Sequence, residues 1–493
     1  MERCPALVFM EAPGVILQST SNQTFGEMHF GNAELGDKRR TKRLVYSADC
    51  LCRHPGGTLP DKFKSPADLK AFYRLCDCDD VTHDAVLTAH RAQVLQQIHR
   101  LRRDILILHD STELDYSTHF ALEGLGQIGN GHHRGYICHN SLAVDPKTRE
   151  VLGLVNQVLH HRPKVGKSET AKQRRERESR ESRLWGEGVA ALPSRRQFID
   201  VCDQGADVFE FLARESSSGR RFVVRAAYDR AIFIGHEKSR RSSYLRKYVS
   251  GLPKLGEFTV KVTSKREEKS PKKKGQKRTH FRKAREATVR VAVAPVRVRP
   301  PVKKSGEYPN EPLPLWIVRA WESNPPRGQE RLEWFLLTNE PVTTFDEARR
   351  VIQWYECRWI IEEYHKALKT GCGIENPQFE TEQRLQPAIA LISVVALSLL
   401  SLRDASRRPN AKKRPATDLI SIDYVQVLSM WRHKRVCTDW SVYDFFFALA
   451  RLGGHQNRKS DKEPGWLVLW RGWTTLQAML EGAMAIKLIK TCG

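Results

Sequence analysis

The chain has 493 residues, of which 82 are Lys or Arg and 57 are Asp or Glu, so its net charge at pH 7 is +25. This length is too great for one hydrophobic core and predicts roughly three or four domains. The charge indicates a polyanionic partner, nucleic acid ahead of an acidic membrane surface. Eleven scattered cysteines fit reduced thiols in a cytoplasm better than a disulfide framework. No signal peptide is recognisable.

Two local features suggest a metal site and a membrane span. The cysteine spacing argues against the first, and the length of the apolar run argues against the second. The pairs Cys50/Cys52 and Cys76/Cys78 each have a one-residue gap, which is tighter than the two-to-four-residue gap of most zinc sites. Neither is followed by a pair with that usual spacing. The longest apolar run, residues 387–402, is shorter than the ~20 residues of a span and contains three serines. We expect a buried helix there.

The N-terminal region is expected to be helical. After a loose leader at residues 1–20, Gly-rich breaks separate short helix-forming stretches. In and beside one helical turn lie the basic residues Lys38, Arg39, Arg40, Lys42 and Arg43. Such a unit would read a DNA end, and a solvated basic face is the alternative.

The first candidate for a catalytic carboxylate follows a short apolar run. Residues 105–108 predict a buried central strand that ends on His109 and Asp110. Two more strands are expected at residues 137–145 and 151–160. Because sites assemble at the carboxyl ends of strands in α/β sheets, Asp110 is well placed.

A second Asp stands in a similar position. Residues 168–185 predict a solvated, charged helix, and residues 198–202 predict a strand that ends at Asp203. An amphipathic helix at 206–214 and a fifth strand at 220–226 follow. One Asp at a strand end is usually a cap or turn residue, but two in matching positions suggest a shared site.

This order of elements is the ribonuclease H-like pattern, in which the first and fourth strands are parallel neighbours. Asp110 and Asp203 would then lie side by side. Beyond Arg225, alternating β-branched and polar residues predict a β-rich insertion. Within it, residues 265–285 form a strongly basic loop or hairpin tip that would follow DNA phosphates or only aid solubility.

Residues 351–371 predict one uninterrupted helix, because they contain no Pro and no Gly before Gly371. At 100° per residue, Cys357, Ile360, Ile361, Tyr364 and Leu368 share an apolar arc. The opposite arc holds Tyr355, Arg358, Glu362, His365, Lys366 and Lys369. From the helix alone, a solvated face with ordinary i,i+4 ion pairs is the favoured interpretation, and only the rest of the chain changes it.

The spacing Tyr355-x2-Arg358-x3-Glu362-x6-Lys369 resembles the signature of the bacterial cut-and-paste transposases of the insertion-sequence four family. The resemblance runs from about residue 25 to about residue 480. It implies that Glu362 is the third acid of a DDE site that holds two Mg²⁺ ions, with Mn²⁺ able to substitute. In that site Asp110 would bridge both ions, and Asp203 and Glu362 would each complete one.

The resemblance also implies DNA contacts. In that family an inserted β-domain carries a Trp that stacks on a base flipped out of the DNA end, and Trp334 matches it, although core packing is the alternative. The other implied contacts are Arg225, Tyr355, Arg358, Lys369, Lys366 and His365, with Arg39, Arg40 and Arg43 in the N-terminal domain.

The predicted fold is α/β, a ribonuclease H-like catalytic core interrupted by a β-rich insertion, with helical N- and C-terminal domains. The boundaries are 1–85 for the DNA-end-binding domain, 86–227 and 343–383 for the core, 228–342 for the insertion and 384–493 for the dimerisation domain.

The implied function is nicking of transposon ends, hairpin formation and opening, and strand transfer to target DNA. We expect a homodimer in a synaptic complex in the bacterial cytoplasm, with no membrane and no nucleotide cofactor. A DNA-binding descendant that no longer cleaves and a plain metal-dependent nuclease remain as alternatives.

Overall fold

The structure is a computed structural model that describes residues 23–492 except 55, 64, 130, 163–168, 236–240, 263–264, 270–277, 303–307, 459–460 and 462. The predicted leader and the middle of the basic 265–285 segment lie outside the described residues. The chain divides into two compact units. The first unit comprises the described residues up to 103, from 111 to 164 and from 360 onward. The second comprises those at 104–110 and 165–359.

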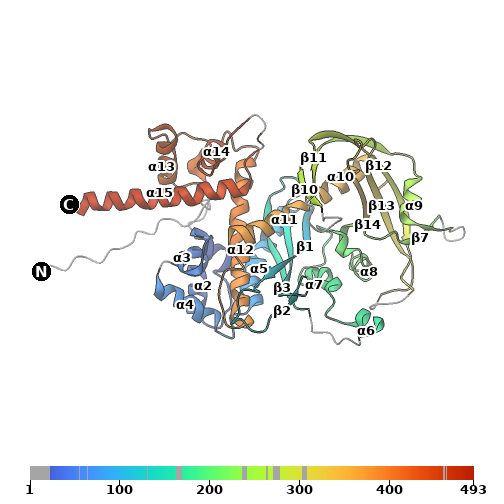
Figure 1. The fold of residues 1–493 in the computed structure, drawn as a ribbon, viewed down its shortest axis with the longest axis horizontal. Helices are drawn as coiled ribbons and strands as arrows, with labels where there is room; N and C mark the ends of the chain where they lie inside the picture. Colours follow the sequence, from blue (N-terminus) through green and yellow to red (C-terminus); the bar gives the residue numbers. More distant parts are fainter. Residues whose placement is uncertain are drawn as a thin grey trace. The chain divides into compact units, whose positions relative to one another are not determined.

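The second unit is built on a mixed sheet with the strand order β1-β5-β6-β14-β13-β12-β7-β8, and β9 also pairs with β12. Figure 1 labels β1, β14, β13, β12 and β7 of this sheet. The pairs β1–β5 and β5–β6 are parallel, whereas the pairs from β6–β14 onward are antiparallel. Its strands are β1 (Ile105–Asp115, first half), β5 (Phe198–Cys202), β6 (Arg221–Arg225), β7 (Ala231–Ile234), β8 (Arg241–Tyr244), β9 (Gly256–Val262), β12 (Arg285–Val298), β13 (Leu313–Glu322) and β14 (Glu333–Thr338), with a separate hairpin of β10 (Lys265–Lys269) and β11 (Arg278–Arg282).

The predicted parallel pairing of the strands at 105–108 and 198–202 is confirmed. Both strands are buried throughout these residues, as a parallel sheet covered on both faces requires. One expectation was wrong, because β1 does not end at Asp110 but continues to Asp115. Its partner β5 stops at Cys202, while the second half of β1 goes on pairing with β3 in the first unit.

Short helices join and cover these strands. They are α6 (Ala171–Glu176), η1 (Glu181–Arg183), α7 (Leu184–Ala190), η2 (Gln204–Ala206), α8 (Phe209–Ser217), α9 (Leu245–Ser250) and α10 (Phe345–Glu356). The single solvated helix predicted at 168–185 is wrong. The chain is extended at Arg177 and Arg180, where ion pairs to Glu169 and Glu210 hold the arginines, and Trp185 is buried.

The first unit holds most of the helices. Its elements are α1 (Phe25–Phe30), α2 (Lys38–Arg53), α3 (Leu59–Phe63), α4 (Pro66–Cys76), α5 (His83–Leu101), β2 (Gly126–Ile128), β3 (His133–Val144), β4 (Val151–His160), α11 (Trp359–Lys366, from its second residue), a π-helical turn η4 (Ala367–Gly371), α12 (Glu382–Arg407), η5 (Ala416–Asp418), α13 (Ile422–His433), α14 (Val442–Leu452) and α15 (Trp466–Cys492). The predicted strands at 137–145 and 151–160 correspond to β3 and β4 and are confirmed.

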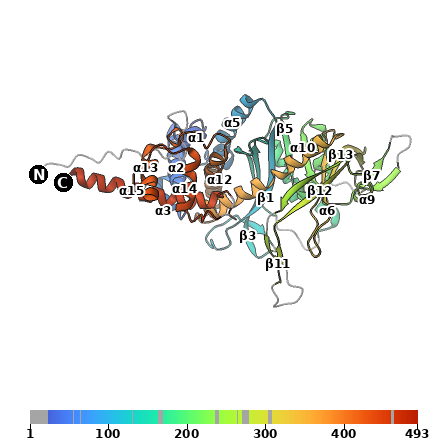
Figure 2. The same ribbon diagram turned by 90° about the horizontal axis from the view of Figure 1, so that it is seen from above.

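Helix α12 is the core of the first unit. It contacts α2, α5, α14 and α15 as well as β4, and Figure 2 shows α2 and α14 next to it. Its 26 residues are long and apolar enough to cross a membrane, but 89% of its most apolar window is buried inside the protein. The predicted buried helix is therefore confirmed, and it is longer than residues 387–402.

The mixed α/β class with helical regions at both ends of the chain is thus as predicted. The segment between residues 228 and 342 is rich in strands, while its interpretation as an insertion and the domain boundaries stay predictions.

Candidate active site

Two aspartates meet where β5 ends beside β1. The last pair in the parallel register is His109 with Cys202, and Asp110 and Asp203 each follow that pair by one residue. Neighbouring strands lie about 4.8 Å apart, so the two carboxylates arise from adjacent backbone positions. Because side chains alternate along a strand, we expect both aspartates to project from the sheet face opposite His109 and Cys202. Both are partly exposed, whereas the residues before them are buried.

A tight turn holds Asp203. Its carboxylate caps η2 by accepting the Gly205 N–H at 2.9 Å. The buried indole of Trp185 packs on Gly205 so closely that a Cβ added there would lie 2.3 Å from the ring. Glycine is therefore required at this position by the close approach of Trp185. The sequence contained both residues, but the contact between them was not predicted.

Arg358 brings a positive charge to Asp110. Its Nη1 lies 3.2 Å from Asp110 Oδ2, and the two side chains are 20% and 18% exposed. Arg358 stands in a turn between α10 and α11, so the uninterrupted helix predicted over residues 351–371 is wrong. The turn is closed by short-range bonds, from Cys357 N to the Trp354 carbonyl and from Arg358 N to the Tyr355 carbonyl.

Tyr355 and Trp334 form an aromatic pair near these carboxylates. Their ring centres are 5.3 Å apart in an edge-to-face arrangement. Tyr355 is only 5% exposed and hydrogen bonds Arg225. Burial raises the pKa of Tyr355, against the nearby charges of Arg358 and Arg225, so its hydroxyl stays protonated. Trp334 is half-buried.

The remaining signature residues belong to the first unit. Glu362 and Lys366 are exposed, and Lys369 Nζ lies 3.0 Å from Glu375 Oε1. His365 is 9% exposed and bonds the Asn140 amide at 3.1 Å, which argues against the predicted DNA contact. Helix periodicity placed His365 on the polar arc, but β3 packs against that position.

The apolar arc of the same helix is confirmed. All of its members are buried, namely Cys357, Ile360, Ile361, Tyr364 and Leu368. The place of Glu362 in a carboxylate triad stays a prediction, since Glu362 and the two aspartates belong to different units.

The three predicted N-terminal arginines lie on α2, and each has an acidic neighbour. Arg39 is 91% exposed and pairs with Asp37 at the helix start. Arg40 pairs with Asp80, and Arg43 pairs with Asp68 at 2.7 Å.

Asp110 and Asp203 fit a hard divalent cation, because carboxylate oxygens are its preferred ligands. The ion pair with Arg358 shows that Asp110 already binds a positive charge. Within the described part of the chain, no three His, Cys, Asp or Glu side chains form a group that could hold a metal ion.

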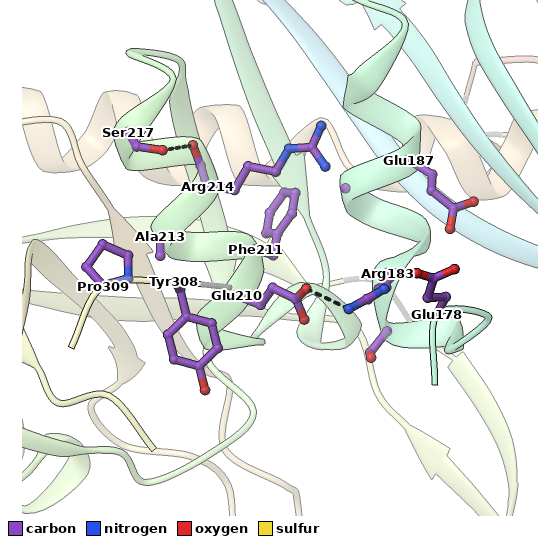
Figure 3. Close-up of a pocket in the computed structure, with 12 residues that line it drawn as sticks. Glu178, Arg183, Glu187, Glu210, Phe211, Ala213, Arg214, Ser217, Tyr308 and Pro309 are labelled. Atoms are coloured by element: carbon purple, nitrogen blue, oxygen red, sulfur yellow. Dashed lines mark hydrogen bonds and ion pairs between the residues drawn. The ribbon is translucent and has the colours of Figure 1, made fainter. Parts of the chain in front are cut away.

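A pocket of about 770 Å³ lies between α7 and α8, and its lining residues are drawn in Figure 3. Its charged lining comprises the carboxylates of Glu178, Glu187 and Glu210 and the guanidiniums of Arg183 and Arg214. Because Glu210 also pairs with Arg183 at 3.4 Å, the pocket lacks the positive charge that a DNA strand requires.

Comparison with protein families agrees with this geometry. Residues 22–81 match the family "Transposase DNA-binding", and residues 102–399 match the family "Transposase DDE domain". The first match covers α1 to α4, and the second covers Asp110, Asp203 and Glu362. Proteins with such a domain use divalent metal ions, and transposon DNA is their partner. The chain therefore belongs to the DDE transposases, enzymes that cleave DNA and transfer its strands.

Proposed function

We propose that this transposase works by the cut-and-paste route and that its nearest kin are the insertion-sequence four enzymes. It would nick each transposon end, and the freed 3′-hydroxyl would attack the opposite strand to form a hairpin. Hairpin opening and strand transfer to target DNA would follow. The observation that carries the proposal is the juxtaposition of Asp110 and Asp203 on one sheet face, with Arg358 on Asp110.

In the proposed site, Asp110, Asp203 and Glu362 would hold two Mg²⁺ ions, which Mn²⁺ would replace. When bound, such a pair of ions activates an attacking hydroxyl and stabilises the leaving oxygen of an in-line displacement. Once Asp110 is neutralised by a metal ion, Arg358 would contact a DNA phosphate instead. Lys366, which is exposed, and Lys369 would add positive charge toward the same backbone.

Trp334 is the residue best suited to hold an extruded base. It is half-buried, and Tyr355 supports it edge-on, so one indole face can be offered to a base. Arg225 reaches the same place through its bond to Tyr355 and would contact DNA there. Because His365 is buried and bonds Asn140, we leave its predicted DNA contact out of this proposal.

The N-terminal helices would read the transposon end through Arg39, Arg40 and Arg43. Their acidic partners are exposed or half-exposed, so phosphates could replace them at small cost. The hairpin of β10 and β11 would follow phosphates farther along the DNA.

We further propose that two copies assemble on DNA in the bacterial cytoplasm. This is supported by the end of α15, where Met484, Ile486 and Ile489 expose 36%, 56% and 71% of their surface. Exposed apolar side chains gathered along one helix are typical of a protein–protein contact.

The test is a cleavage assay on a DNA fragment taken from the immediate flank of the gene. Wild type, Asp110→Asn and Glu362→Gln would be incubated with Mg²⁺ or Mn²⁺ and the products separated on a denaturing gel. Asp115→Asn is the matched control, since it removes a half-exposed carboxylate from the same strand.

We expect nicks and hairpins at a fixed end from wild type and the control. Both site variants should bind the fragment without cutting it. Binding without cleavage by wild type would favour a DNA-binding descendant, and uniform degradation would favour a plain nuclease.

A further inference from the structure

The two strands that carry the candidate carboxylates are joined by a buried ionic network. Asp200, in the middle of β5, is fully buried. His109 of β1 bonds its Oδ1 at 2.9 Å. Arg220, just before β6, donates to both carboxylate oxygens, from Nε to Oδ2 at 2.8 Å and from Nη2 to Oδ1 at 2.7 Å. One carboxylate thus connects three adjacent strands.

The network is closed on its other side by α8. Glu215 is fully buried, and its Oε2 lies 3.4 Å from Arg220 Nε. Burial and the neighbouring Asp200 carboxylate raise the pKa of Glu215 well above its usual value. The closest partner of Arg220 is Asp200, both of whose carboxylate oxygens accept a bond from the guanidinium.

The network lies on the opposite face of the strands from the candidate site. Asp200 pairs in register with Ile107, so it shares a face with His109. Asp110 and Asp203 alternate with these residues and project from the other face. A slip of β1 by one residue would send Asp110 to the wrong face.

Because β1 and β5 are buried on both faces here, their apolar side chains specify the register only weakly. A buried ion pair of this kind adds little net stability. Directed bonds from Asp200 to His109 and to Arg220 are satisfied only in the observed register.

We propose that Asp200 and Arg220 are positioning residues that fix β1 and β6 against β5 and thereby set the spacing of Asp110 and Asp203. The inference rests on the proposed role of those two carboxylates in DNA cleavage.

The test compares Asp200→Asn in the full chain with Glu322→Gln. Glu322 is also buried and also binds an arginine in a two-pronged fashion, with Arg285 nitrogens at 2.9 and 2.8 Å, but it lies on β13 and does not touch β1. Both variants weaken a buried ion pair, but only Asp200→Asn also changes the carboxylate that bonds His109 of β1.

At a temperature where circular dichroism shows all proteins folded, we expect Asp200→Asn to cleave the DNA end about 10–100-fold more slowly than Glu322→Gln. End-DNA affinity should be unchanged, and the Mn²⁺ concentration for half-maximal cleavage should rise. A general loss of structure would lower binding as well and would leave the metal requirement where it was.

Equal cleavage rates and equal Mn²⁺ requirements in the two variants would overturn the inference. If Asp200→Asn does not fold, the double variant Asp200→Leu/Arg220→Met takes its place in the test. It fills the space of the buried ion pair with apolar side chains. A folded double variant that cleaves like wild type would also overturn it. Asp110→Asn distinguishes failure of this inference from failure of the proposed function. Cleavage by Asp110→Asn would refute the proposed function itself.

Discussion

Arg358 lies 3.2 Å from the carboxylate of Asp110, although 248 positions separate the two residues in the chain. This guanidinium neutralises the charge of the Asp110 carboxylate. Replacement by Gln should therefore destabilise the metal-free protein by about 1 kcal/mol, because the pair is partly buried. Added Mg²⁺ should restore more stability to Arg358→Gln than to wild type, since it supplies the missing charge.

The measurement is the melting temperature of both proteins in EDTA and in Mg²⁺. We expect Arg358→Gln to melt about 2–4 °C lower in EDTA, with a smaller difference in Mg²⁺. Arg350→Gln, on α10, is a control that leaves Asp110 untouched. The same difference in both buffers would contradict the explanation.

Gly205 is predicted to be intolerant of any side chain. In Gly205→Ala the new methyl group would meet the outer ring of Trp185 at 2.3 Å, so the turn that orients Asp203 must shift. We expect cleavage to fall about 10²-fold while end-DNA binding persists. Trp185→Phe removes the atoms that clash, and the double variant should recover part of the lost rate. Absence of recovery would show that the contact is not the cause.

Trp334→Ala should separate nicking from hairpin formation. Loss of a base stack removes about 1–3 kcal/mol, so hairpin yield should fall while the first nick proceeds normally. Trp334→Phe should show an intermediate loss. Trp321→Ala is the matched control, because Trp321 lies on neighbouring β13 and pairs with Glu333, so it projects from the opposite face. A gel time course of nicked and hairpin products measures both steps, and equal loss of both would refute the assignment.

The contact between His29 and His90 predicts a pH-dependent stability. His90 Nε2 accepts the Leu154 N–H at 3.1 Å, so its Nδ1 carries the proton and donates to His29 Nδ1 at 3.0 Å. Burial lowers the pKa of His29 to about 4 and the pKa of His90 well below its usual value. The unfolded chain takes up protons near pH 6.5, whereas the folded protein does not.

Stability should therefore be complete above pH 6.5 and fall as the pH approaches 4, by as much as roughly 3 kcal/mol from His29. Melting temperatures across this range test the expectation. The variant His29→Gln/His90→Gln should lose much of the pH dependence, whereas His133→Gln, at a half-exposed histidine, should keep it. A dependence that is unchanged in the double variant would assign it to other groups.

Several features could be read from the sequence because local composition determines them. Residues 105–108 are an apolar run too short for a helix, and residues 198–202 are apolar apart from Asp200, so both were predicted as buried strands. The apolar arc of residues 357–368 is buried as predicted, since it follows from helix periodicity alone. The spacing of the signature residues resembles that of a transposase family, and the match to a transposase DDE domain agrees with the chemistry which that resemblance implies.

Which polar side chains are buried was decided only by the tertiary structure. Tyr355 and His365 share a predicted polar face with Glu362, yet both are buried. Periodicity gives the angle of a side chain about the helix axis but not what packs at that angle. The link from Asp200 to His109, which joins residues 91 positions apart, likewise exists only through the register of β1 on β5, because that register brings the two side chains within hydrogen-bonding distance.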